Sequence, residues 1–232
     1  MTLAVAALLA AVAIALTAVY GPRLVGAFEP YEGEPVRREI PSRLALGIME
    51  TAVVAGMTMA VTSWGDIRLL PAYLYLSVIG VVLAAVDLRV HRLPDAIVLP
   101  SYLILAALFA CAAVADRITY GYWGCPLGRT SHLAWRAAVG AAIPLIFFGL
   151  LHLMPRSGLG LGDLKVAGLL GAALGWVNLL LVPVGLMIGI LTAGLWAALL
   201  LVTRRARRTD AIPYGPHLLL GAFLALLIST GT

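Results

Sequence analysis

Long apolar runs divide the chain into eight segments, and short stretches that hold most of the charged residues separate them. A helix needs roughly 20 apolar residues to cross the hydrocarbon core of a bilayer. The run 159–202 is too long for one span and too short for three, so we divide it at Gly175 to Asn178. The predicted spans are 2–20, 44–64, 69–86, 96–115, 137–154, two within 159–202, and 212–230.

Composition supports the same class of protein. Hydrophobic residues make up 62% of the 232, charged residues only 12%, and the mean hydropathy is +1.02. A soluble domain carries about a quarter charged residues. These values exclude an ordinary globular enzyme and a disordered chain, and they predict an all-α polytopic membrane protein with about eight transmembrane helices, surrounded by lipid. The net charge of +5 does not indicate a nucleic-acid partner, because the basic residues lie in short loops between apolar spans.

The first run resembles a secretory signal in length but not in its flanks. No Lys or Arg precedes it, and Arg23 follows it. A cleaved signal has its positive charge before the apolar segment. We therefore expect residues 1–20 to form a retained first helix with its N-terminus outside.

Basic residues are distributed unequally between alternate loops. Twelve of the sixteen follow the odd-numbered spans: Arg23, Arg37, Arg38, Arg43, Arg89, Arg92, Arg156, Lys165, Arg204, Arg205, Arg207 and Arg208. The other four are Arg68, Arg117, Arg129 and Arg136. Loops rich in Lys and Arg stay in the cytoplasm. We therefore expect the first set to be cytoplasmic. The chain is then one membrane-embedded domain, 1–232, in which a short cytoplasmic loop at 21–43 separates the first helix from the helices of 44–232.

Four of the eleven acidic residues stand out by position. Most of the others lie in solvated loops or at span ends, whereas Glu50, Asp87, Asp95 and Asp163 lie within or beside apolar segments. Asp87 ends the third span and Asp163 opens the sixth, at matching depth on the cytoplasmic side. An ionisable group at that depth is costly and is by default a functional candidate. The alternative is that each carboxylate only caps or flanks a helix.

Glycines precede the second of these aspartates. Gly158, Gly160 and Gly162 have no side chains, so another chain can approach their backbone closely. Non-helical backbone at membrane depth persists only against protein or a water-filled cavity. The run is therefore typical of a groove in which an extended peptide can lie, or of close helix packing through small residues.

Two facing carboxylates have a defined chemistry. Like charges close together cannot both ionise, so the pair shares a proton. The ionised member can take a proton from water while the protonated member polarises a peptide carbonyl, which hydrolyses an amide without a covalent intermediate. No nucleotide loop or metalloprotease motif is present, and Cys111 and Cys125 have no zinc spacing. The sequence therefore predicts no metal and no cofactor.

Three ordered motifs resemble one protein family. They are Asp87 followed by Leu93-Pro94-Asp95, the run Gly160-Leu161-Gly162-Asp163-Leu164-Lys165, and the late segment Ile212-Pro213-Tyr214-Gly215-Pro216. Together they are similar to the type IV prepilin peptidases, Gly-x-Gly-Asp intramembrane aspartic proteases, from about residue 43 to the C-terminus.

The resemblance implies a role for each matching residue. Asp87 and Asp163 match the two catalytic aspartates, and Asp95 matches a supporting acid of the same loop. Lys165, the only lysine, matches a cation that could hold one carboxylate ionised, and Glu50 resembles an acid near the start of the family's second span. The supporting set also includes Gly160 and Gly162.

One stretch departs from the family pattern. Larger members carry paired cysteines that bind zinc between their first two spans, and they methylate the new N-terminus. Residues 21–43 contain no cysteine, so the sequence predicts a short form with no zinc site there and places methyltransferase activity in doubt.

The resemblance also implies a substrate: a prepilin or pseudopilin, cut at the cytoplasmic face after a glycine, between a basic leader and an apolar helix. The rival hypothesis is a proton-coupled transporter that uses membrane-edge aspartates. A transporter would favour acids near the bilayer midplane and inverted repeats, and the sequence shows neither. The sequence does not indicate an oligomeric state.

Overall fold

A computed structural model describes residues 2–28, 41–120, 128–154, 160–204 and 213–229. In these ranges the chain forms eight α-helices and one short 3-10 helix, η1, and contains no strand, which confirms the predicted all-α fold. The helices are α1 (Thr2–Gly26), α2 (Arg43–Ser63), α3 (Leu70–Val90), α4 (Asp95–Tyr120), α5 (Gly128–His152), α6 (Leu161–Val177), α7 (Leu181–Val202) and α8 (Gly215–Ile228); η1 covers Ile67–Leu69.

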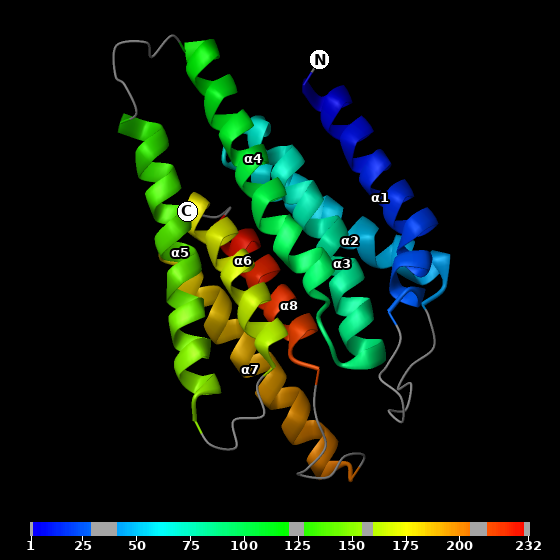
Figure 1. Cartoon of the computed structure of the whole chain (residues 1–232). Coiled ribbons are helices and arrows are strands. Elements are labelled where there is room, and N and C mark those ends of the chain that lie inside the picture. Colours follow the sequence, from blue (N-terminus) through cyan, green and yellow to red (C-terminus); the bar gives the residue numbers. More distant parts are fainter. Residues whose placement is uncertain (1, 29–40, 121–127, 155–159, 205–212, 230–232) are drawn as a thin grey trace.

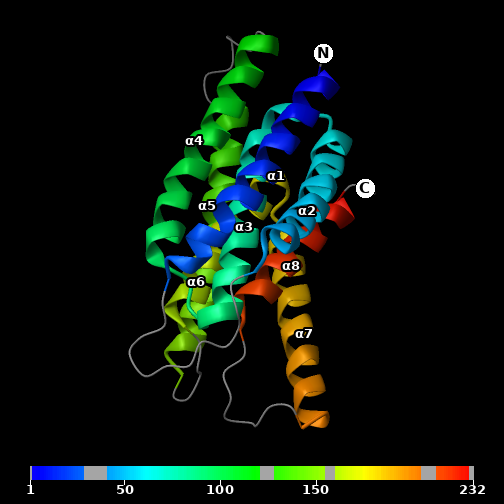
Figure 2. The same ribbon diagram turned by 90° about the vertical axis from the view of Figure 1, so that its right-hand side faces the viewer.

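Six of the described helices are long and apolar enough to cross a membrane, namely α1 to α5 and α7. The other two, α6 and α8, have 17 and 14 residues. At about 1.5 Å per residue, α6 is about 26 Å long, slightly less than a hydrocarbon core of roughly 30 Å. Figures 1 and 2 show α6 and α8 between the longer helices, so their neighbours cover much of their length.

The first helix is longer than its apolar run suggested. It continues past Tyr20 to Gly26, with Pro22 inside it, so the predicted loop at 21–43 begins later. The added turns are stabilised by packing, because Val25 is fully buried against Val86 and Val90 of α3. Hydropathy ends the span where polar residues begin, whereas tertiary contacts carry the helix further.

Glycines bring two pairs of helices into very close contact. At the α5–α6 crossing, a Cβ on Gly171 would collide with the backbone carbonyl of Gly140, and one on Gly175 would collide with the carbonyl of Arg136. At the α7–α8 crossing, a Cβ on Gly221 would collide with the backbone of α7 at Gly185. Small residues spaced in this way let helix backbones approach inside a membrane.

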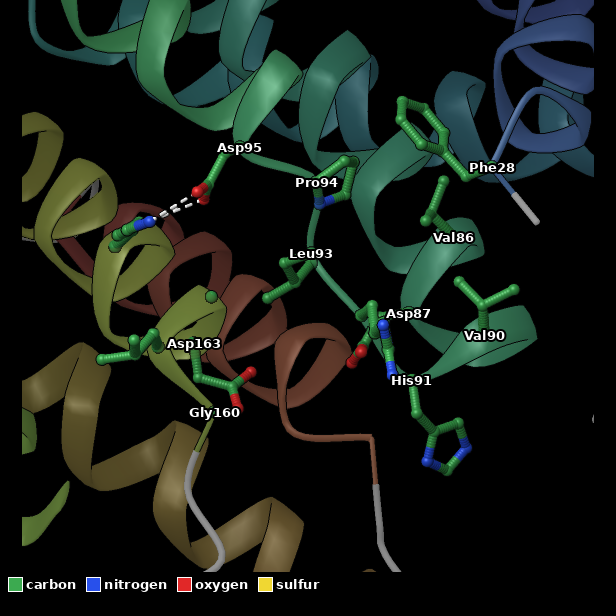
Figure 3. A pocket seen from close by; sticks show the side chains of 14 residues that line it. Phe28, Val86, Asp87, Val90, His91, Leu93, Pro94, Asp95, Gly160 and Asp163 are labelled. Carbon is green, nitrogen blue, oxygen red and sulfur yellow. Dashed lines mark hydrogen bonds and ion pairs between the residues drawn. The ribbon is translucent and has the colours of Figure 1, made fainter. Parts of the chain in front are cut away.

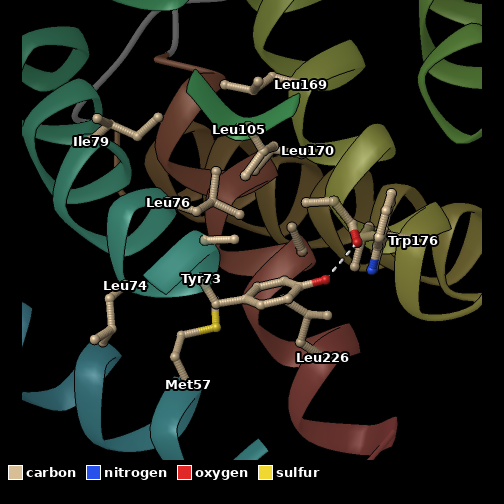
Figure 4. Packing of buried hydrophobic residues seen from close by; sticks show 14 of the residues in the cluster. Met57, Tyr73, Leu74, Leu76, Ile79, Leu105, Leu169, Leu170, Trp176 and Leu226 are labelled. Carbon is tan, nitrogen blue, oxygen red and sulfur yellow. Dashed lines mark hydrogen bonds between the residues drawn. The ribbon is translucent and has the colours of Figure 1, made fainter. Parts of the chain in front are cut away.

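The third helix forms the centre of the bundle. Most of its residues are buried, and α1, α2, α4 and α8 all contact it. Figure 4 shows the side chain of Tyr73, which is fully buried and donates a hydrogen bond to the carbonyl oxygen of Ala173 in α6 at 2.8 Å. Nearby, Phe109 of α4 stacks on Trp176 of α6 with ring centroids 4.4 Å apart. The hydrogen bond joins α3 to α6, the two helices that carry the candidate aspartates, and the ring stack joins α4 to α6.

Candidate active site

The first candidate aspartate lies at the end of the central helix. Asp87 is in the last turn of α3 and is 3% exposed. Its Oδ2 accepts a hydrogen bond from the backbone N–H of Gly215, the first residue of α8, at 3.0 Å. The chain then reverses at His91, which has a left-handed conformation (φ 52°, ψ 40°) and donates its N–H to the Asp87 carbonyl at 2.8 Å. A left-handed residue after a helix satisfies one of the last carbonyls.

The second candidate aspartate lies at the start of a helix. Asp163 is in the first turn of α6, is half-buried, and follows an extended Gly160 that precedes the helix without a side-chain cap. The backbone N–H of Gly160 faces the Asp163 carboxylate. The prediction that this aspartate opens the sixth helix is confirmed.

Both aspartates line one pocket of about 770 Å³. Figure 3 shows their carboxylates on opposite walls of this pocket, directed toward the space between α3 and α6. The fold therefore brings two residues that are 76 positions apart in the sequence to one pocket, with both carboxylates directed into it. The other residues that line the pocket are Phe28, Val86, Val90, His91, Arg92, Leu93, Pro94, Asp95, Gly160, Leu161, Gly162 and Lys165.

The described glycines of the run have different roles. A Cβ on Gly162 would lie 2.9 Å from the Cβ of Leu93 and 3.2 Å from its carbonyl oxygen, so Gly162 admits the loop that links α3 to α4. A Cβ on Gly160 would meet only Asp163 Oδ2, at 3.4 Å, and the next backbone nitrogen. Gly162 therefore serves close packing through a small residue, which was one of the two explanations for the glycine run. Both glycines also line the pocket. Gly158 lies outside the described residues.

The lysine of the motif binds a different carboxylate from the one expected. Lys165 Nζ lies 2.7 Å from both carboxylate oxygens of Asp95. This ion pair joins Lys165, the fifth residue of α6, to the first residue of α4 and crosses one edge of the pocket (Figure 3). Asp95 is therefore the partner that Lys165 holds, because the two helix starts lie opposite each other.

The structure does not bring Glu50 to the pocket. Its side chain is fully buried in α2, and its Oε1 accepts a hydrogen bond from the Ser77 hydroxyl of α3 at 2.8 Å. Glu50 is absent from the residues that line the pocket. Its position supports a contact between α2 and α3 and not a contact with the two aspartates.

Sequence reasoning gave no role to two residues that shape the site. Gly215 supplies the N–H donor to Asp87, and a Cβ there would lie 2.9 Å from Asp87 Oδ2. A glycine between two prolines in 213–216 was the available signal. Phe28 lines the pocket from the end of α1. No sequence signal identified it, since its position depends on how far α1 extends.

The described residues contain no group of three or more His, Cys, Asp or Glu side chains that could hold a metal ion. Cys111 is a free, exposed cysteine in α4. Cys125 and residues 29–40, most of the cysteine-free loop, lie outside the described residues, so the absence of a zinc site there remains a prediction.

Comparison with known proteins agrees with the class that this fold and site define, a membrane-embedded protein with paired aspartates. The model of the type IV leader peptidase family matches residues 74–229. The match includes both pocket aspartates and covers about two thirds of the chain (156 of 232 residues). The chain therefore belongs to the type IV leader peptidase family.

Curated relatives lead to the same family. A prepilin leader peptidase/N-methyltransferase of Aeromonas salmonicida is 30% identical over 181 residues, which are 76% of this chain and 54% of that protein. The protein of the same name from Aeromonas hydrophila is 27% identical over 179 residues, again 76% of this chain and 54% of the relative. The chain thus spans about half the length of these relatives. No solved structure matches it.

Proposed function

We propose that this protein is an aspartic endopeptidase that removes the leader peptide from prepilin or pseudopilin-like proteins. The observation that carries the proposal is the pairing of Asp87 and Asp163 across one pocket. The relatives' name, prepilin leader peptidase, supplies the substrate class. The proposal does not extend to the methyltransferase activity in that name, because the two aspartates account for peptide hydrolysis and not for methyl transfer.

The geometry supports hydrolysis by water. One carboxylate takes a proton from a water molecule whose oxygen attacks the scissile carbonyl carbon, while the protonated partner donates a hydrogen bond to the carbonyl oxygen. Collapse of the tetrahedral intermediate breaks the C–N bond, and a proton passes to the leaving nitrogen. The products are a carboxylic acid and an amine. The N–H of Gly215 holds Asp87 Oδ2, which leaves Oδ1 for the water or the substrate.

The active site is proposed to face the cytoplasm. The support is the unequal distribution of basic residues, twelve to four, between the two sets of loops. The turn at 91–94 and Gly160, which border the pocket, belong to the more basic side. A leader peptide in the cytoplasm would therefore meet the aspartates before export.

The side of the membrane can be tested with single cysteines. In a background that lacks Cys111 and Cys125, Thr203→Cys at the end of α7 is expected to label from the cytoplasmic side, and Leu180→Cys before α7 from the outside. Both positions are exposed. Labelling with the opposite pattern would reverse the proposed orientation.

The activity is tested by co-expression with a prepilin and analysis of substrate size on a gel. Wild-type protein is expected to cleave, and Asp87→Asn and Asp163→Asn are each expected to lose cleavage by about a thousandfold or more. The matched control is Asp66→Asn, which changes an aspartate at the opposite end of the bundle, before η1. Near-normal cleavage by either pocket variant, at equal membrane levels, would refute the assignment of the aspartate pair.

A further inference from the structure

Asp87 lies in a part of its helix that tertiary contacts must support. It is the fourth residue from the end of α3, which ends at Val90. The last carbonyl groups of a helix lack partners within it, and the ends of helices fray. The turn continues into His91, whose left-handed conformation is unfavourable for a residue other than glycine. Contacts from outside α3 are therefore needed to keep the Asp87 carboxylate in place.

Arg89, two residues after Asp87, makes one such contact. Its Nη1 donates hydrogen bonds to the carbonyl oxygens of Val25 at 2.8 Å and Phe28 at 3.0 Å. Both carbonyls lie at the end of α1, where a cation is favourable. No Asp or Glu of the described residues forms an ion pair with Arg89, so these two carbonyls are its partners in this part of the chain.

Apolar packing joins the same two helices. Val86 and Val90 are buried in one cluster with Val25 of α1. Val86 directly precedes Asp87, and Val90 is the last residue of α3, so α1 packs along the whole last turn. The helix α1 lies before residues 74–229, the part of the chain that matches the family. A segment outside that match therefore supports the turn that carries a pocket aspartate.

The turn is held from two sides. Successive residues of an α-helix are rotated by about 100°, so Arg89 and Asp87 project to nearly opposite sides of α3. The contacts agree with this, because Arg89 reaches α1 whereas Asp87 Oδ2 accepts the N–H of Gly215 in α8 at 3.0 Å. Loss of either support frees the turn to move. A displacement of about 1 Å at a reacting group can lower a rate by about a hundredfold.

We infer, on the basis of the proposed function, that Arg89 is a positioning residue for Asp87. It ties the last turn of α3 to the end of α1 and so keeps the Asp87 carboxylate at the N–H of Gly215. The helix α1 thereby takes part in the catalytic framework, although it contributes neither carboxylate.

The first test measures the turn itself and needs no substrate. Hydrogen exchange followed by mass spectrometry reports the opening of backbone N–H groups, including that of His91, which donates to the Asp87 carbonyl at 2.8 Å. Arg89→Ala is expected to lower the protection of residues 86–92 by about tenfold and to leave the start of α6 unchanged. Arg43→Ala, at the exposed start of α2, is the control. Unchanged protection in Arg89→Ala would overturn the inference.

The second test measures cleavage of a prepilin. Arg89→Ala is expected to lower kcat by about tenfold at nearly unchanged KM, because bound substrate meets a correctly placed carboxylate less often. Arg89→Lys keeps a donor for one carbonyl and is expected to recover part of this loss, whereas Arg89→Met keeps only the apolar stem and recovers none. Val25→Ala leaves Arg89 intact but loosens the packing of α1 on Val86, and it is expected to lower kcat by about threefold.

A double variant tests whether Arg89 acts through Asp87. Gly215→Ala disturbs the same carboxylate from α8. Arg89→Ala combined with Gly215→Ala is therefore expected to lose less activity than the product of the two single losses. A loss equal to that product would show that Arg89 acts elsewhere and would contradict its positioning role.

The outcomes separate this inference from the proposed function. If wild-type protein cleaves a prepilin and Arg89→Ala keeps the wild-type kcat, or if Arg89→Lys and Arg89→Met are equally impaired, the positioning role is wrong while the peptidase assignment stands. If wild-type protein cleaves no native prepilin, the proposed function fails and the role in catalysis fails with it. Equal amounts of each variant in the membrane, with unchanged elution on gel filtration, exclude misfolding as the cause. Should Arg89→Ala not accumulate, the comparison of Arg89→Lys with Arg89→Met decides.

Discussion

The two aspartates of the pocket occupy opposite ends of their helices. Asp163 lies in the first turn of α6, and Asp87 lies in the last turn of α3. The start of a helix offers unpaired N–H donors, whereas its end offers only unpaired carbonyl acceptors. A carboxylate needs donors, so the local environment suits Asp163 and does not suit Asp87.

A second helix compensates for the position of Asp87. The backbone N–H of Gly215 at the start of α8 donates to its Oδ2. The N-terminus of a helix is a favourable place for an anionic group. Asp163 therefore receives its donor from the chain just before it, and Asp87 receives one from a residue 128 positions away. The comparison predicts that Asp87 depends more on tertiary structure.

The largest expected difference concerns side-chain length. Asp87→Glu is expected to lower kcat by about a hundredfold or more, because Oδ2 already lies at hydrogen-bond distance from the Gly215 N–H and a longer side chain displaces the carboxylate from that donor. Asp163→Glu is expected to lose about tenfold, since Asp163 is half-buried at the pocket wall. Cleavage rates in detergent-solubilised protein measure both. Equal losses would contradict the unequal dependence of the two aspartates.

The contact with α8 can be broken by one methyl group. Gly215→Ala places a Cβ 2.9 Å from Asp87 Oδ2, so the carboxylate or α8 must shift, and kcat is expected to fall by tenfold to about a hundredfold. Gly194→Ala in α7 is the matched control, because its Cβ meets nothing within 4 Å. Normal cleavage by Gly215→Ala would mean that this hydrogen bond does not position Asp87.

The glycines before Asp163 provide a finer test of the other wall. Gly162→Ala is expected to lower kcat by roughly tenfold, because its Cβ would press on Leu93 and displace the loop after Asp87. Gly160→Ala adds only an ordinary contact with Asp163 and is expected to change kcat by less than about threefold. A reversed order would show that open space at Gly160 matters more than the packing of the loop.

The smallest effect is expected at the charged end of the pocket. Asp95→Asn and Lys165→Met are each expected to lower cleavage by no more than about fivefold, since the pair is partly exposed and such ion pairs contribute little. Raising the salt concentration is expected to lower the cleavage rate of the wild-type protein by a similar factor and that of the variants by less. A loss as large as that of Asp163→Asn would give Asp95 or Lys165 a direct part in catalysis.

The helices and the aspartates could be predicted from the sequence because both depend on local signals. Apolar runs of membrane length define the spans, and a carboxylate beside such a run is rare enough to notice. Asp87 and Asp163 were found in this way, and their pairing in one pocket agrees with the prediction. The pairing itself could be predicted because the sequence puts both aspartates on the same side of the membrane and at the same depth.

The partners of these residues could be decided only by tertiary structure. Lys165 is two residues from Asp163 in sequence, yet it binds Asp95, because the starts of α4 and α6 face each other. Glu50 lies in an apolar run, as Asp87 does, yet it faces Ser77 and not the pocket. A helix turn fixes which neighbours along the chain share a face, but not which helix lies opposite.

What the sequence determined by itself was the class of protein, the number and order of its helices, and the two carboxylates at its membrane edge. These follow from hydropathy and charge, which act on each segment separately. Tertiary structure decided that α1 extends to Gly26, that Arg89 of α3 donates hydrogen bonds to the carbonyl oxygens of Val25 and Phe28 at its end, and that Phe28 lines the pocket. These features depend on side-chain and backbone contacts between segments that are about 60 residues apart, as Arg89 and Phe28 are, and no local pattern encodes such contacts.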